Sequence, residues 1–174
     1  MELMFQWILQ LHSYWTLLVF LTTIFVIINC SFSLVMKKKF QTFDLRLSLY
    51  ALIFNHIQLI IVLILYFISP KLSWWNNGVK SVIHNIEHRL YLIEQPIANI
   101  LGVIILSLGW SLHKKSSKSS KKFLRIGVFY LIGFISISSK FSWWKLTKKT
   151  LSKKESATKT KLFMNLKFNF ILGN

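Results

Sequence analysis

The chain has few acidic side chains, and two long stretches of it carry no charge at all. Its 174 residues include five Asp and Glu against 22 Lys and Arg, and residues 14–36 and 47–70 contain none of these four residue types. A helix of about 20 apolar residues crosses the roughly 30 Å hydrocarbon core of a bilayer, where backbone groups must bond within their own segment. Each stretch is therefore long enough to span a membrane. A composition that is 53% hydrophobic also argues against an ordinary soluble domain.

Cysteine is almost absent, which excludes an intrachain disulfide. The single cysteine, Cys30, lies inside the first uncharged stretch, where we expect a small buried thiol. The N-terminus also lacks the basic residues and the small-residue cleavage site that are typical of a signal peptide. We therefore predict that the first stretch is a retained helix.

Two further stretches complete an all-α prediction. Residues 90–112 are uncharged except for Glu94, and in residues 123–144 the charged Arg125 and Lys140 lie near the ends, where long side chains reach the headgroups. The sequence thus predicts an integral membrane bundle of four transmembrane helices, at about residues 14–36, 47–69, 90–112 and 123–144. They form one domain, residues 1–144. The tail that follows, residues 145–174, is lysine-rich, and its Lys, Ser and Thr content favours disorder.

A short interfacial helix is expected in the loop between the second and third spans. Apolar residues recur there at helical spacing from Val79 to Ile93, with His84 and His88 on another face. The run from His84 to His88 also matches H-x-x-E-H, a signature in which two histidines bind zinc and the glutamate acts as base. A zinc site would need a further ligand, so a water-facing amphipathic helix is the simpler interpretation.

Basic residues gather in the first and third loops and predict the orientation of the chain. They are Lys37, Lys38, Lys39 and Arg46 in the first loop, and Lys114, Lys115, Lys118, Lys121, Lys122 and Arg125 in the third. The positive-inside rule places both loops in the cytoplasm. The basic tail disagrees, so either the fourth segment does not cross or the tail translocates regardless of its charge; we favour four crossings. We expect the basic loops to attract anionic lipid headgroups, and no nucleic acid, because no nucleic-acid-binding module accompanies the charge.

The histidines are the residues best suited to chemistry, and their expected depths separate them. His12 is expected at the outer rim of the first helix, in one layer with His88 and Glu94, whereas His56 lies about 14 Å from the cytoplasmic end of the second helix, near the midplane. An ionisable residue at that depth is a functional candidate, and the alternative is a neutral histidine that hydrogen-bonds between helices. Side chains expected at the depth of His56 are Thr22, Thr23, Asn99 and Tyr130.

Several short motifs follow one another in a recognisable order between residues 8 and 144. They are Leu11-His12-Ser13-Tyr14-Trp15, Asp44-Leu45-Arg46, His56-Ile57-Gln58-Leu59, Leu65-Tyr66-Phe67-Ile68-Ser69-Pro70, Arg89, Glu94-Gln95-Pro96, Lys114-Lys115 and Trp143. In this order they resemble a family of small four-helix bacterial membrane proteins, few of them characterised and often labelled cytochrome b-like. The resemblance implies a multi-pass protein of the bacterial inner membrane. It also implies a possible b-type haem held by histidines.

Two departures from the family pattern bear on that haem. The family usually has histidine where this chain has Gln95, and proline where it has Ser142. If His12 were one axial ligand, an amide at Gln95 would be a poor substitute for the second imidazole. His88, seven residues before Gln95, is the candidate replacement. The candidate residues for a haem or a polar-layer site are His12, His56, His88 and Glu94.

The sequence favours a multi-pass membrane protein without a catalytic role, which acts as a structural or assembly partner of another membrane protein. Acid–base catalysis needs an acid and a base held together, and Glu94 is the only acid within a predicted span. Two alternatives stay open: electron transfer by a b-type haem, and transfer of protons or a small solute through a polar layer around His56. Helix packing would be helped by glycines that permit close approach, namely Gly102, Gly109, Gly127 and Gly133.

Overall fold

The computed structural model describes residues 2–139, which form helices and short connections with no β-strand among them. The four long helices are α1 (Glu2–Val35), α2 (Thr42–Ile68), α5 (Gln95–Lys114) and α6 (Ser119–Ser139). Four helical segments are long and apolar enough to cross a membrane: Leu3–Val35, Thr42–Ile68, Ile86–Lys114 and Ser119–Ser139. The prediction of an all-α fold with four such segments is confirmed. The predicted tail and the end of the predicted fourth span lie outside the described residues.

Helix α1 departs most from its predicted bounds, because it begins at Glu2 rather than near Tyr14. Residues 3–13 contain no charged side chain and no proline or glycine, so nothing in them ends an apolar helix. At 1.5 Å per residue, the 34 residues of α1 extend about 51 Å. This exceeds the thickness of a hydrocarbon core, so α1 would have to tilt or project beyond it.

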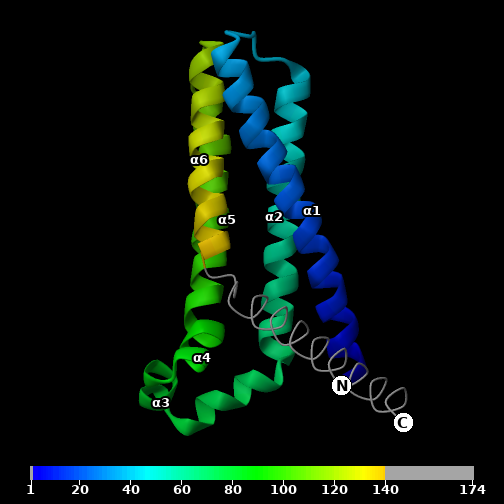
Figure 1. The fold of residues 1–174 in the computed structure, drawn as a ribbon, viewed down its shortest axis with the longest axis vertical. Helices are drawn as coiled ribbons and strands as arrows, with labels where there is room; N and C mark the ends of the chain where they lie inside the picture. The colour runs from blue at the N-terminus through cyan, green and yellow to red at the C-terminus, as the bar shows by residue number, and fades with distance from the viewer. Residues whose placement is uncertain (1, 140–174) are drawn as a thin grey trace, which may run out of the picture. The chain divides into compact units, whose positions relative to one another are not determined.

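The four long helices form a ring in the order α1, α2, α5, α6, in which each helix packs against its two neighbours. The short α1–α2 and α5–α6 connections lie at one end of this bundle, and the longer α2–α5 connection lies at the other end (Figure 1). Helices α5 and α6 share the most extensive contact of the ring, and α2 and α5 share the least. We call the end that contains residues 37–46 and 114–125 the basic end, and the opposite end the loop end.

Glycines permit the close approach of α5 and α6. A Cβ atom added at Gly133 would lie 2.9 Å from the carbonyl oxygen of Gly102, and one added at Gly109 would lie 2.5 Å from the Cβ of Phe129. Carbon atoms in contact prefer separations of about 3.5–4.0 Å, so neither position has room for a side chain. The expectation that these glycines bring helices together is confirmed for this pair.

The buried core lies in the half of the bundle near the basic end. Its largest fully buried side chains are Tyr130, Phe123, Leu106, Ile126 and Val26. The hydroxyl of Tyr130 on α6 donates to the backbone oxygen of Ser48 on α2 at 2.7 Å. Helices α2 and α6 lie diagonally opposite each other in the bundle, so this hydrogen bond links them through its centre.

The α2–α5 connection contains four short helical pieces: η1 (Pro70–Asn77), α3 (Val79–His84), α4 (Ile86–Arg89) and η2 (Leu90–Glu94). Asn85 has extended backbone angles, φ −87° and ψ 117°, and its side chain accepts hydrogen bonds from the backbone N–H groups of Glu87 and His88. A helix cap of this kind starts a new helix. The apolar residues between Val79 and Ile93 thus lie on more than one helical piece, and a short helix at the membrane surface stays a prediction.

A wide π-helical turn, η2, joins α4 to α5 just before Pro96. Proline has no N–H, so the carbonyl of Leu92 loses the donor that an ordinary helix would supply. The hydroxyl of Tyr66 donates to this carbonyl at 3.3 Å and accepts from Trp75 Nε1 at 3.2 Å. These two bonds attach the connection at the loop end to helix α2.

Candidate functional site

His12 lies in a polar contact between α1 and α2. The side-chain nitrogen of Gln58 is 2.7 Å from His12 Nδ1 and donates to Thr16 Oγ1, also at 2.7 Å. The other amide atom, Gln58 Oε1, is buried and has no hydrogen-bond partner among the described residues. The sequence predicted that His12 lies in one layer with His88 and Glu94. In the structure, its hydrogen-bond partner is Gln58, which is only two positions from His56.

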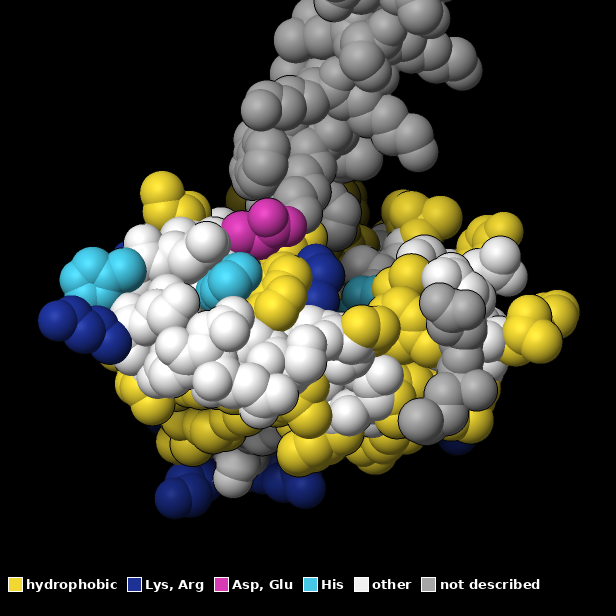
Figure 2. Space-filling view, turned by 90° about the horizontal axis from the view of Figure 1, so that it is seen from below, with side chains coloured by type: hydrophobic (Ala, Val, Ile, Leu, Met, Phe, Trp, Pro, Cys, Tyr) yellow, Lys and Arg dark blue, Asp and Glu magenta, His cyan; other side chains and the backbone are white. Residues whose placement is uncertain are grey.

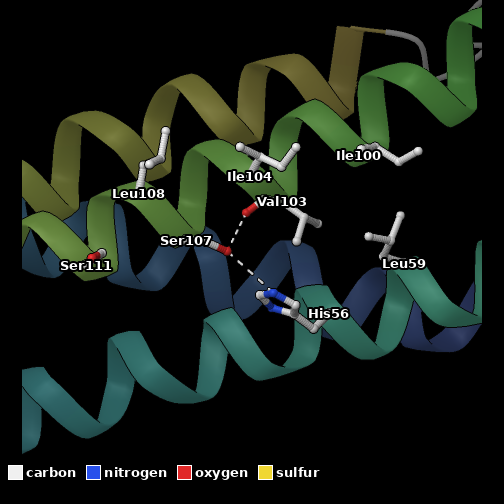
Figure 3. Close-up of a pocket in the computed structure, with 8 residues that line it drawn as sticks. All are labelled: His56, Leu59, Ile100, Val103, Ile104, Ser107, Leu108 and Ser111. Atoms are coloured by element: carbon white, nitrogen blue, oxygen red, sulfur yellow. Dashed lines mark hydrogen bonds between the residues drawn. The ribbon is translucent and has the colours of Figure 1, made fainter.

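His56 faces a groove between α2 and α5, the neighbouring pair of long helices with the least extensive contact (Figure 3). The groove has a volume of about 440 Å³, and most of its lining is apolar. Helix α5 contributes a stripe at helical spacing: Ile100, Val103, Ile104, Ser107, Leu108 and Ser111. The side chain of His56 is exposed, so it borders the outside of the bundle rather than its centre.

The hydrogen bonds of His56 determine which of its nitrogens is free. Nδ1 lies 2.8 Å from the carbonyl oxygen of Leu52, and because a carbonyl only accepts, Nδ1 carries the proton. In the neutral ring, Nε2 is then an acceptor. Its neighbour, the Ser107 hydroxyl, is 3.4 Å away and already donates to the Val103 carbonyl at 2.8 Å. Nε2 of His56 is therefore an acceptor without a strong donor among the described residues.

The polar layer expected around His56 is not formed as one unit. Thr23 accepts a hydrogen bond from Asn55 at 3.0 Å, Thr22 donates to backbone carbonyls of its own helix, and Tyr130 donates to Ser48. The sequence did not predict that Ser107 is the partner of His56. The two residues are 51 positions apart, and an isolated serine does not indicate a contact with a distant histidine. A continuous path for proton transfer has no support from these separate pairs.

His88 lies at the loop end, where its ring stacks on Trp74. The ring centroids are 4.1 Å apart and the planes differ by 23°. Lys71 Nζ lies 3.1 Å from the centroid of the Tyr91 ring, and this ring packs edge to face against Trp74. The sequence alone did not indicate that Trp74 is the partner of His88. This stacked cluster holds η1 against α4 and η2.

Glu94 forms an ion pair with Arg89, with 2.8 Å between Arg89 Nε and Glu94 Oε1. The side chains are 41% and 27% exposed, so the pair contributes little to stability. A view onto the loop end places histidine, acidic and basic side chains close together there among apolar ones (Figure 2). His88 and Glu94 thus share the loop end, as the sequence predicted, whereas His12 contacts α2.

The structure separates the residues that a haem would need. His12 contacts Gln58, His56 contacts Ser107, and His88 stacks on Trp74. The groove beside His56 is lined by one histidine, whereas a bis-histidine haem needs two imidazoles on opposite sides of one pocket. Haem binding stays a hypothesis from the sequence, and these side-chain contacts do not fit it.

A zinc site has no support either. The cap at Asn85 ends α3 at His84, so His84 and His88 do not lie one turn apart on a single helix. Within residues 2–139, no group of three His, Cys, Asp or Glu side chains is placed to hold a metal ion. The H-x-x-E-H residues therefore lack the single-helix geometry of that signature.

No protein-family model, curated protein or solved structure matches this chain. The resemblance to small four-helix membrane proteins consequently rests on the sequence motifs alone.

Proposed function

We propose that this chain is a non-catalytic, multi-pass membrane protein that acts as an assembly partner. Its α2/α5 groove binds a transmembrane helix of another membrane protein. The observation that carries the proposal is the acceptor His56 Nε2, whose one contact is a long 3.4 Å approach of the Ser107 hydroxyl, in an apolar groove that opens at the side of the bundle. A polar group that faces lipid has no partner there, and a neighbouring helix can supply one.

The lining of the groove supports a helix as its occupant. The six α5 residues recur every three or four positions, which is the pattern of a helix face that packs against another helix. Two of them, Ser107 and Ser111, are small and carry hydroxyls, and small residues let helix backbones approach closely within a membrane. The partner helix is expected to carry a hydrogen-bond donor, such as a serine, threonine or asparagine side chain, opposite His56.

A photo-crosslinking amino acid at Ile104 tests this proposal. Ile104 lines the groove and is 48% exposed, while Leu131 on α6 is 44% exposed and outside the groove. Leu131 is a matched control in depth, because each residue lies two positions from the Gly102–Gly133 contact. In cells, we expect the probe at residue 104 to form an adduct with one membrane protein several times more often than the probe at residue 131.

The crosslinked peptide should map to a transmembrane segment that contains a polar residue, and His56→Leu should reduce the adduct. His56 is exposed, so this substitution removes the acceptor without opening a cavity in the core. Equal adducts from residues 104 and 131 would contradict the proposal. An adduct only with a second copy of this chain would replace it with self-association.

The haem alternative predicts a Soret absorption band, which the structure gives no reason to expect. We expect the detergent-purified protein to show no stoichiometric Soret band, because its three candidate histidines lie in three separate contacts. The measurement is an absorption spectrum of the oxidised and dithionite-reduced protein together with iron analysis, before and after haem supplementation. Sharp reduced α and β bands at one haem per chain would contradict this expectation and favour electron transfer.

A further inference from the structure

Packing of aromatic side chains joins the two connections of the basic end. Phe40, in the α1–α2 connection, packs edge to face on Phe123 of α6, with ring centroids 5.0 Å apart, and lies 5.8 Å from the ring of His113 at the end of α5. Lys122 Nζ lies 5.4 Å from the Phe40 ring. The basic residues that are about 80 positions apart in the sequence therefore belong to one surface.

This surface has a large excess of positive charge. Residues 37–46 and 114–125 contain ten Lys and Arg and one acid, Asp44. Both oxygens of Asp44 are used within the fold, since Oδ1 accepts from Asn29 at 2.8 Å and Oδ2 accepts from the backbone N–H of Gln41 at 2.9 Å. Within residues 2–139, the Arg89–Glu94 ion pair lies at the opposite end of the bundle. The cations of the basic end thus have no anionic partner in the described chain.

Exposed apolar side chains begin directly beside these cations. Val35 and Phe43 flank the first connection and are 78% and 61% exposed, and Leu124 of α6 is 52% exposed. Most of the ten basic side chains are exposed as well. A ligand that fits both features has an anionic head and an apolar tail.

We infer that the basic end binds anionic phospholipid headgroups, whose acyl chains lie along the apolar helix surface below. The inference rests on the proposed placement of the four helices in a membrane. A soluble acidic protein or a nucleic acid would meet the cations but leave the adjoining apolar side chains unmatched. Headgroup phosphates match the cations, and one lysine or arginine near an anionic membrane surface raises binding about fivefold.

Spin-labelled lipids test the inference with the full chain in phosphatidylcholine bilayers. The measured quantity is the ratio of association constants for spin-labelled phosphatidylglycerol and phosphatidylcholine at the protein surface. We expect a ratio of about five or more in low salt, falling towards one in 1 M NaCl, where the screening length drops to about 3 Å. A ratio near one in low salt would overturn the inference.

Substitution of five cations locates the effect. The variant replaces Lys39, Arg46, Lys115, Lys118 and Lys121 with Gln, because within residues 2–139 these side chains make no hydrogen bond and no ring contact. The control replaces five tail lysines with Gln, namely Lys148, Lys149, Lys153, Lys154 and Lys159, and so removes the same charge. We expect the first variant to lose most of the selectivity and the control to keep it. Equal losses in both variants would overturn the assignment to the basic end.

The same spectra separate this inference from the membrane placement on which it depends. A bilayer-spanning chain immobilises some spin-labelled phosphatidylcholine whatever its charge. Immobilised phosphatidylcholine with no preference for phosphatidylglycerol overturns the inference alone, and no immobilised lipid of either kind overturns membrane insertion as well. Salt dependence of the unmodified chain tests the inference independently if the five-residue variant does not fold.

Discussion

Replacing Gly133 with Ala is expected to lower the free energy of unfolding by about 1–3 kcal/mol, the range for overpacked interiors. The added methyl group would lie 2.9 Å from the carbonyl oxygen of Gly102, and a backbone atom cannot rotate away from it. Helices α5 and α6 must then separate along their main contact. The measurement is denaturant-induced or thermal unfolding of the purified protein, followed by far-ultraviolet circular dichroism.

Gly102→Ala provides a sharper version of the same test, because its closest clash is with a side chain. A Cβ at residue 102 would lie 2.4 Å from Cγ1 of Ile137. We expect Ile137→Ala to restore part of the stability lost in Gly102→Ala, with a coupling energy of at least about 0.5 kcal/mol between the two sites. Additive losses in the double variant would show that the two helices do not approach in this way.

Replacing Tyr130 with Ala is expected to have the largest effect of any single substitution proposed for this chain, about 3–5 kcal/mol. The side chain is fully buried and belongs to the largest core cluster, so its removal leaves a cavity among Val26, Leu106 and Ile126. Unfolding measured under the same conditions as for the glycine variants gives the comparison. Leu131→Ala, at an exposed position one residue further along, should change stability by less than about 0.5 kcal/mol.

Tyr130→Phe separates the ring from its hydroxyl. It removes only the hydrogen bond to the Ser48 carbonyl, and we expect a loss of about 0.5–1.5 kcal/mol. A loss as large as that of Tyr130→Ala would mean that the bond from α6 to α2, rather than the packing of the ring, holds the centre of the bundle. Retention of full stability in both variants would show that Tyr130 is not part of the core.

The candidate site was predictable in its residue types but not in its contacts. His56 was identified because an ionisable residue in a long uncharged run is conspicuous. Its depth came from counting along one helix, but the face it presents depends on how α2 packs against its neighbours. The sequence therefore predicted a polar layer that includes Thr23 and Tyr130. In the packed bundle, Thr23 instead accepts a hydrogen bond from Asn55, and the neighbour of His56 is Ser107.

The glycines illustrate the same limit on a larger scale. Their small size predicted close contacts between helices, and the structure has such contacts at Gly102, Gly109 and Gly133. Without a Gly-x-x-x-Gly motif, no pattern indicated that Gly102 and Gly133 meet each other or that Gly127 faces Cys30 on α1. Such pairings depend on the relative register of two helices, which is a property of the packed bundle.

By itself the sequence located the apolar middle of each long helix, although not the start of α1, because apolar runs with few charges favour backbone hydrogen bonds within their own segment. It also placed the basic residues in the two short connections and in the helix turns beside them. Only the tertiary structure decided that Phe40 joins those connections into one cationic surface, and that α2 and α5 leave a groove beside His56. The physical reason is that helix formation uses contacts four residues apart, whereas a surface or a groove depends on side chains that pack across tens of residues.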